Sequence, residues 1–253
     1  MTGPGEDLPG PHAGAAPPPG GPAISLAFFD PERGLSGTVR HGLTLIFGGE
    51  QDGAAEGADI QVDAESAYRA TLDQRLVLEF EPVTEPARLG GARVRVCRVT
   101  GTVEGRSLDC LGTAAETFQA PRWEELDAFR AVSALFDSGH AVLAVASRPR
   151  GVAGHGHELV SSALLTDGEL HAVEEARLST VYDGDGRQRA ASMELFLPGE
   201  DFPRRAAGEV AAGTTLELPG LLVNVSVFDW RMEGRDGAGG YELTVRSEPP
   251  TAA

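Results

Sequence analysis

Short stretches in which apolar and polar residues alternate recur along most of this 253-residue chain. The clearest apolar sets are Leu43, Leu45 and Phe47; Leu76, Leu78 and Phe80; and Val94 with Val96. Successive side chains of a β-strand point to opposite faces, so a period of two predicts strands with one buried and one solvated face. The pattern therefore predicts an antiparallel all-β protein.

Turn-forming residues separate several pairs of these segments. Glycine and aspartate adopt the backbone conformations that tight turns need. Hairpin turns are predicted at residues 104–105, 137–140, 183–186 and 235–237.

One stretch near the middle of the chain departs from this pattern. Trp123, Leu126, Phe129 and Val132 are spaced three apart after Pro121, which predicts a short helix. The helix would link two halves of similar strand density, residues 23–120 and 121–248, which are expected to form two related sheets or barrels. One continuous β-sandwich is the alternative.

Composition and charge narrow the choice of partners. The net charge is −17, with 38 acidic and 21 basic residues, which argues against nucleic-acid or anionic-membrane partners. All the basic residues are arginines, so Schiff-base chemistry and a P-loop lysine are excluded. The absence of lysine is typical of a GC-rich genome, such as that of an actinomycete.

The N-terminal residues and the two cysteines indicate the cellular compartment. Residues 1–22 are rich in glycine and proline, have no export-signal pattern and are expected to be a disordered tail. No apolar run is long enough to insert in a membrane. We expect a cytoplasmic protein in which Cys97 and Cys110, although close across a hairpin, stay reduced.

Two clusters have the residue types of metal ligands. His155 and His157 could chelate a metal on one face of a strand, with His140 or His171 as a third ligand. However, the glycines in this stretch indicate a loop, and no cysteine or carboxylate has a convincing ligand spacing. Asp183 and Asp185 stand in a glycine-rich stretch that lacks the further oxygen ligands of a calcium loop. We therefore predict no metal site, a pocket mouth lined by His155 and His157, and a hairpin turn at Asp183.

Motifs of two enzyme classes are missing. There is no Gly-x-Ser-x-Gly elbow of a serine hydrolase and no dinucleotide-binding glycine motif between a strand and a helix. We predict no cofactor.

Residues 223–232 place polar groups among apolar ones on both faces of one strand. Asp229 and Arg231 continue the face of the three valines at 223, 225 and 227, whereas Asn224 and Ser226 share the other face with Phe228 and Trp230. An apolar lining with a few polar groups is typical of a small-molecule site. An Asp229–Arg231 pair near the open end of a strand is the alternative interpretation.

Two motifs resemble a known family. Residues 29–37, Phe-Asp-Pro-Glu-Arg-Gly-Leu-Ser-Gly, and the ending at 230–242 are similar to the lipocalin-like two-domain proteins related to hydroxyneurosporene synthase. The resemblance implies two calycin-type β-barrels in tandem. It also implies a carotenoid hydratase, or a cyclase of natural-product pathways including Diels–Alderases, that needs no redox cofactor. At the barrel junction, only Arg122-Trp123 is similar to the aromatic part of the family's pattern.

Two functions fit these features. The first is a cofactor-free enzyme that hydrates, isomerises or cyclises an apolar isoprenoid or polyketide, and the second is a carrier or sensor of such a molecule. Hydration needs a general acid, whereas a cyclisation mainly needs the substrate held in a reactive conformation.

The expected site lies in the C-terminal half. The candidate catalytic carboxyls are Glu194, Asp229 and Glu242, and the candidate substrate contacts are Trp123, His155, His157, Phe228, Trp230, Arg231 and Tyr241. An arginine keeps a neighbouring carboxyl ionised, so the proton donor is expected to be the carboxyl farthest from any arginine. Glu194 is our choice.

Overall fold

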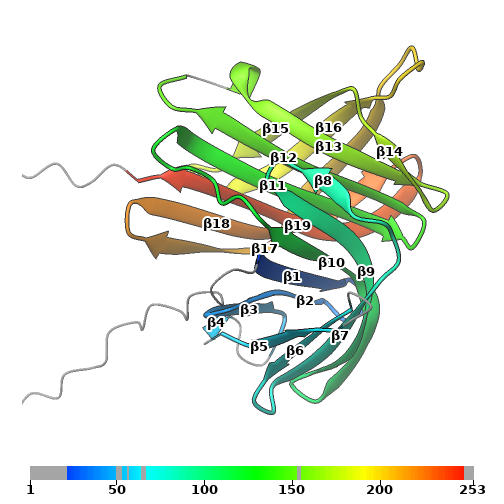
Figure 1. Ribbon diagram of the computed structural model, residues 1–253, viewed down its shortest axis with the longest axis vertical. Helices are drawn as coiled ribbons and strands as arrows, with labels where there is room; N and C mark the ends of the chain where they lie inside the picture. Colours follow the sequence, from blue (N-terminus) through cyan, green and yellow to red (C-terminus); the bar gives the residue numbers. More distant parts are fainter. Residues whose placement is uncertain (1–21, 50–52, 56, 64–66, 153–154, 248–253) are drawn as a thin grey trace, which may run out of the picture.

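The computed structural model describes residues 22–49, 53–55, 57–63, 67–152 and 155–247 (Figure 1). This part of the chain is nearly all β-strand, and its one helical element is the single 3₁₀ turn η1 (His155–His157). No helix within these ranges is long and apolar enough to cross a membrane. The prediction of an antiparallel all-β protein is confirmed.

The predicted helix near Trp123 is wrong. Residues 123–125 form a turn, and strand β11 (Leu126–Asp137) begins directly after it. From there the buried side chains alternate, at Ala128, Arg130, Val132 and Ala134, with the period of two that a strand imposes. The three-residue spacing of the apolar residues was therefore coincidental.

The first ten strands form one curled antiparallel sheet. Its order is β4-β3-β2-β1-β10-β9-β7-β6-β5, and β8 pairs with β9 outside this path. The strands are β1 (Ala23–Asp30), β2 (Leu35–Arg40), β3 (Leu43–Phe47), β4 (Gly53–Ala55), β5 (Asp59–Val62), β6 (Tyr68–Leu72), β7 (Leu76–Pro82), β8 (Ala87–Leu89), β9 (Ala92–Val103) and β10 (Arg106–Thr117).

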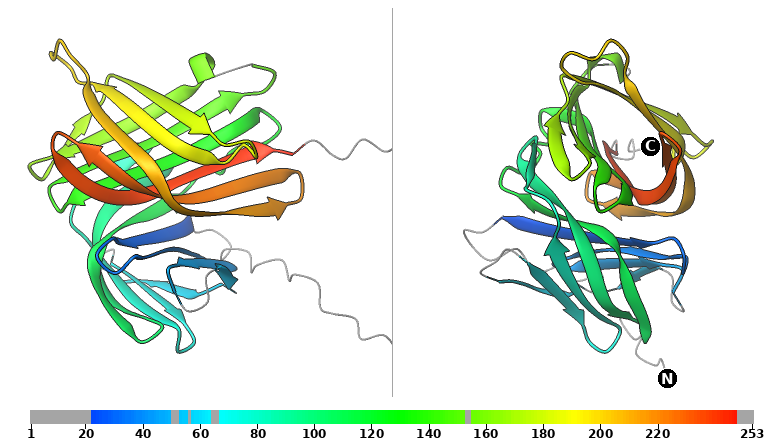
Figure 2. Two further views of the ribbon diagram at one scale, coloured as in Figure 1. Left: turned by 180° about the vertical axis from the view of Figure 1, so that it is seen from behind. Right: turned by 90° about the vertical axis from the view of Figure 1, so that its right-hand side faces the viewer.

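The remaining nine strands form a second curled sheet, of order β14-β13-β12-β11-β19-β18-β17-β16-β15. Besides β11, they are β12 (His140–Pro149), β13 (Leu159–Thr166), β14 (Glu169–Ala172), β15 (Glu175–Tyr182), β16 (Gln188–Phe196), β17 (Arg204–Leu218), β18 (Leu221–Met232) and β19 (Arg235–Arg246). Viewed along its strands, this sheet closes almost into a ring (Figure 2, right).

Both sheets have the same topology. In each, the first strand pairs with the last, β1 with β10 and β11 with β19, and the other strands follow as meanders on either side. The chain thus contains two half-barrels in tandem that repeat one strand order without an evident sequence repeat.

Three apolar cores hold this arrangement together. One fills the first half-barrel around Phe28 and Phe80, and a second fills the other around Trp230 and Tyr241. The third lies between the half-barrels, around Phe29, Leu45 and other residues on the outer faces of both sheets. Because the outer faces of β1, β11, β18 and β19 are covered in this way, they can line a site between the barrels.

Most of the predicted hairpin turns are confirmed. The turns at 104–105, 137–140 and 183–186 join β9 to β10, β11 to β12 and β15 to β16. The last turn is at Glu233 and Gly234 rather than at 235–237, because β19 already begins at Arg235. Both turn residues have positive φ, 51° and 79°, as in the turns that match the twist of a hairpin.

Candidate functional site

Strand β18 is buried on both faces along most of its length. Asn224, Ser226, Phe228 and Trp230 point into the second barrel, and the three valines at 223, 225 and 227 point toward the first. The polar and apolar side chains predicted for this strand therefore lie in two different environments, one on each face of the sheet.

The first environment is a cavity of about 130 Å³ between the two barrels. Its walls are mainly small or apolar side chains from the outer faces of both sheets. They include Ala27, Phe29, Phe47, Leu89, Val94, Ala131, Leu143, Val145, Val225 and Val227. Because both half-barrels contribute, the cavity exists only when they are packed together.

An ion pair between Arg40 of β2 and Glu242 of β19 lines one end of this cavity. The side chains are 35% and 20% exposed, so this end of the cavity meets solvent. The Glu242 carboxylate raises the pKa of Arg40, and the Arg40 Nε–H also donates to Ser25 Oγ at 3.0 Å. Glu242 therefore presents a carboxylate held by Arg40 at the cavity end, where it can orient a polar group of a substrate.

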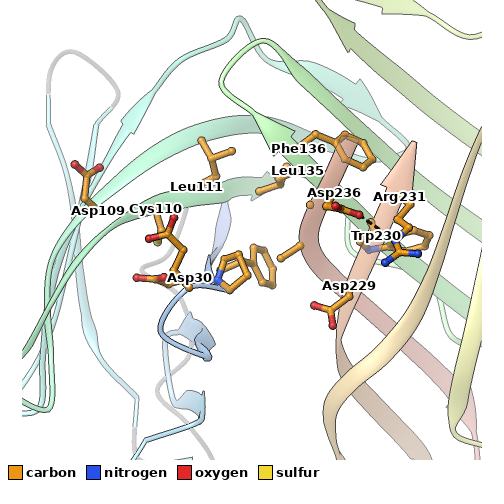
Figure 3. Close-up of a pocket in the computed structure, with 15 residues that line it drawn as sticks. Asp30, Asp109, Cys110, Leu111, Leu135, Phe136, Asp229, Trp230, Arg231 and Asp236 are labelled. Carbon is orange, nitrogen blue, oxygen red and sulfur yellow. Dashed lines mark hydrogen bonds and ion pairs between the residues drawn. The ribbon is translucent and has the colours of Figure 1, made fainter. Parts of the chain in front are cut away.

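Phe29 lines the other end of the cavity and also lines an open groove of about 470 Å³. Figure 3 shows this groove, with Asp30 and Asp109 on one side and Asp229 and Arg231 on the other. The groove is lined by apolar side chains together with five carboxylates, and Arg231 is the one cation among the described residues that line it. The carboxylates are Asp30, Glu32, Asp109, Asp229 and Asp236. Some of these carboxylates are paired with arginines. Arg231 pairs with Asp236 at 2.9 Å, and hydrogen bonds from Arg98 hold the pKa of Asp109 below its usual range.

The second environment is the interior of the second barrel. Arg130 and Glu158 form an ion pair there whose side chains are only 1% and 2% exposed. Arg130 Nη1 also donates to Thr180 Oγ1 at 3.1 Å and to the Tyr241 hydroxyl at 3.2 Å, and burial raises the pKa of Tyr241. Charges so deeply buried need this degree of pairing, because their desolvation is costly.

Further polar groups continue this network along the barrel. Gln188 donates to the carbonyls of Asn224 and Tyr241 and accepts from Ser226 Oγ. Phe228 stacks on Trp230 with ring centroids 5.3 Å apart. These hydrogen bonds and ring contacts connect side chains from several strands inside the barrel and hold them in position.

The structure does not bring the expected site residues together. Trp230 and Tyr241 lie inside the second barrel with Phe228, whereas Asp229, Arg231 and Glu242 are on the opposite faces of the same two strands. Neighbouring residues of a strand necessarily point to opposite sides of the sheet. Glu242 lines the interdomain cavity, and Asp229 and Arg231 line the groove.

Glu194 does not fulfil the criterion by which it was chosen. Its carboxylate accepts from Arg205 Nε at 3.0 Å on the outer face of β16, away from both the cavity and the groove. Of the three candidate carboxyls, Glu194 and Glu242 are paired with arginines. Among the described residues, no arginine pairs with Asp229.

The remaining predicted contacts lie elsewhere. Trp123 is half-buried in the turn before β11, and its carbonyl accepts from Arg246. His157 is exposed in η1 next to the buried Glu158, and only the backbone of His155 is described. In the described ranges, no three His, Cys, Asp or Glu residues are grouped closely enough to hold a metal ion.

Four residues of these sites were missed in the sequence. Phe29 was noted only as part of a motif, and Arg40, Arg130 and Glu158 were not singled out as functional. Arg40 and Glu242 are 202 residues apart in sequence, so no local pattern joins them. The motif signal at Phe29 was present, since the residues around it form the groove.

Comparison with known proteins identifies the fold. No protein-family model and no curated protein sequence matches the chain. The solved structures that are similar include kievitone hydratase from Nectria haematococca and an AttH candidate from Nitrosomonas europaea. The first has a TM-score of 0.54 at 11% identity and covers 90% of this chain and 89% of that chain. The second has a TM-score of 0.52 at 16% identity, with coverages of 88% and 81%.

These similarities support the expected architecture. The chain has a lipocalin-like fold of two β-barrels in tandem. One of the similar structures is a hydratase, which bears on function only together with the geometry of the site.

Proposed function

We propose that this protein is a cofactor-independent enzyme that binds an apolar isoprenoid or polyketide between its two barrels and cyclises, isomerises or hydrates it. The observation that carries the proposal is the interdomain cavity, whose apolar walls end at an ion pair with one partner from each barrel. Such a combination of apolar lining and a few convergent polar groups is typical of small-molecule sites.

The cavity walls define how a substrate would be held. Valine, leucine and phenylalanine side chains would bind the apolar part of a substrate through dispersion contacts and by removing it from water. A hydroxyl or carbonyl of the substrate would bind at Arg40 and Glu242, which supply donors and acceptors respectively. Holding a flexible chain in one folded conformation removes much of the entropic barrier to ring closure.

The ion pair favours reactions that need no strong acid. Glu242 beside Arg40 can accept a proton from a substrate hydroxyl or activated carbon and return it, as an isomerisation or cyclisation needs. Acid-catalysed hydration needs a proton donor that this pair does not supply. Asp229, the candidate carboxyl that no arginine pairs within the described residues, lies in the adjoining groove and would serve only a substrate whose reacting end reaches the groove. The shared fold with kievitone hydratase keeps hydration among the proposed reactions.

A carrier or sensor is the second candidate function. Glu242 is the only carboxyl group among the described residues that line the cavity, and it is ion-paired. A protein that only binds its ligand has no need of a proton donor, so this observation favours the carrier.

The test compares variants of the charge pair at the cavity with a variant of a charge pair that lies on the outer face of β16, away from the cavity. Arg40→Met and Glu242→Gln remove one partner each of the cavity pair, while Glu194→Gln breaks the comparable pair with Arg205 on the outer face. Binding and turnover of a panel of linear isoprenoids and polyketide-like polyenes are measured for each variant, with folding checked by circular dichroism.

We expect both cavity variants to lose about 100-fold in turnover, because a misplaced substrate costs this much. Glu194→Gln should keep the wild-type rate. If the two cavity variants also keep it, the reaction does not take place at this pair. If the wild-type protein binds members of the panel and converts none, the carrier function replaces the enzyme.

A further inference from the structure

Phe29 occupies the boundary between the interdomain cavity and the open groove. It lines both spaces, and its side chain is only 2% exposed. Along β1, Leu26 and Phe28 point into the first barrel, so Phe29 points the opposite way, toward the second. The ring therefore lies across the cleft rather than inside either barrel.

The opposite wall is shaped to receive this ring. A Cβ atom at Gly240 of β19 would be 3.2 Å from Phe29 Cζ, closer than ordinary van der Waals contact. The ring thus packs close to the backbone of the second barrel, and a side chain at position 240 would require it to shift by a few tenths of an ångström. On this face of β1, the residue between Ser25, which is opposite Arg40, and Phe29 is the small Ala27, which also lines the cavity.

The pairing register gives the distance along β1 between the backbone positions at the two ends of the cavity. Arg40 is opposite Ser25 on β1, and Phe29 is four residues further along the same strand. At about 3.3 Å per residue, the two ends are roughly 13 Å apart. Beyond Phe29, in the groove, carboxylates join the apolar side chains of the lining.

We propose that Phe29 is the end wall of the substrate site and sets the length of the apolar group that the site accepts. The assignment rests on the proposed function, because it takes the cavity beside Arg40 and Glu242 as the substrate site. The substrate class is then a molecule whose polar group binds the ion pair and whose apolar body extends no more than roughly 13 Å toward Phe29. The ring also separates that body from the charged groove, where burial of carboxylates against an apolar chain is unfavourable.

A series of straight-chain alcohols tests this assignment through binding alone. Hexanol to dodecanol are titrated into the wild-type protein, Phe29→Ala and Leu45→Ala by calorimetry. Leu45 is the matched control, since it is 1% exposed in the same interdomain core and lines neither the cavity nor the groove among the residues described. Both variants remove a large buried side chain, so both lose stability.

For the wild-type protein, affinity should increase about fourfold for each added methylene and then stop increasing at a limiting chain length. In Phe29→Ala the increase should continue beyond that limit, because further methylenes can fill the space that the ring vacates. Leu45→Ala should keep the wild-type limit. Phe29→Leu, a smaller change, should move the limit by less than Phe29→Ala and serves if Phe29→Ala does not fold.

The outcomes separate the two proposals. If the alcohols bind and the limit is the same in wild type and in the folded Phe29 variants, Phe29 is not the end wall, whereas the proposed function is unaffected. If Leu45→Ala extends the limit as much as Phe29→Ala, loosened packing explains the change and the assignment is also wrong. If no alcohol binds the wild-type protein, the cavity is not an apolar binding site and both proposals fail.

Discussion

The buried ion pair of the second barrel gives the sharpest stability prediction. Glu158→Gln keeps the size of the side chain and removes its charge, which leaves the Arg130 guanidinium without its counter-charge at 1% exposure. Removing one partner of a buried pair costs about 3–5 kcal/mol, because the remaining charge stays desolvated. The pair Arg231–Asp236 is the control: its side chains are 84% and 82% exposed, so Asp236→Asn should cost about 0–1 kcal/mol.

Urea unfolding measures the difference directly. With an m-value of about 2 kcal/mol/M, a cost of 3–5 kcal/mol lowers the unfolding midpoint by roughly 1.5–2.5 M. Fluorescence of Trp230, which is fully buried in the same barrel, reports the transition alongside circular dichroism. The double variant Arg130→Met with Glu158→Leu should be closer to wild type than Glu158→Gln, since no charge is then left buried.

The predicted loss of stability comes from the desolvation of Arg130, and the exposed pair Arg231–Asp236 shows the cost of losing a pair without desolvation. If Glu158→Gln lowers the midpoint no more than Asp236→Asn does, water reaches Arg130 in the native protein and the barrel interior is not sealed. If the double variant is less stable than the single one, the network with Thr180 and Tyr241 contributes more than the charge does.

Two further predictions concern ionisation and backbone. Burial raises the pKa of Cys97 and of Cys110 to about 12, so the folded state keeps protons that the unfolded chain, with thiol pKa values of about 8.5, loses. This stabilisation is complete below the pKa of the unfolded chain and is lost as the pH rises toward 12. The urea midpoint should therefore fall from pH 8 to pH 11, and a constant midpoint would contradict the prediction. Gly101 has φ +137° and a Cβ there would be 2.0 Å from the Val77 carbonyl oxygen. Gly101→Ala should therefore cost at least about 1–3 kcal/mol in thermal unfolding, while Gly184→Ala, with nothing within 4 Å, should cost less than half as much.

Local patterns in the sequence were sufficient for the strands and most of their turns. Alternation along β7 and β18 shows which side chains share a face, because the strand period of two is a property of the backbone itself. The same logic correctly separated Asn224 and Ser226 from Asp229 and Arg231. It failed at Trp123, where three-residue spacing across a turn and a strand imitated a helix.

The site depended on how the faces meet, which the sequence alone did not determine. The expected site placed Trp230 and Tyr241 beside Asp229 and Glu242, although the sheet itself separates the two pairs. Arg40 faces Glu242 only because the first and last strands pair within each sheet and the outer faces of the two sheets then pack together. Burial of apolar surface drives that packing, and it acts between residues of any sequence separation, so it brings together side chains that no local spacing connects.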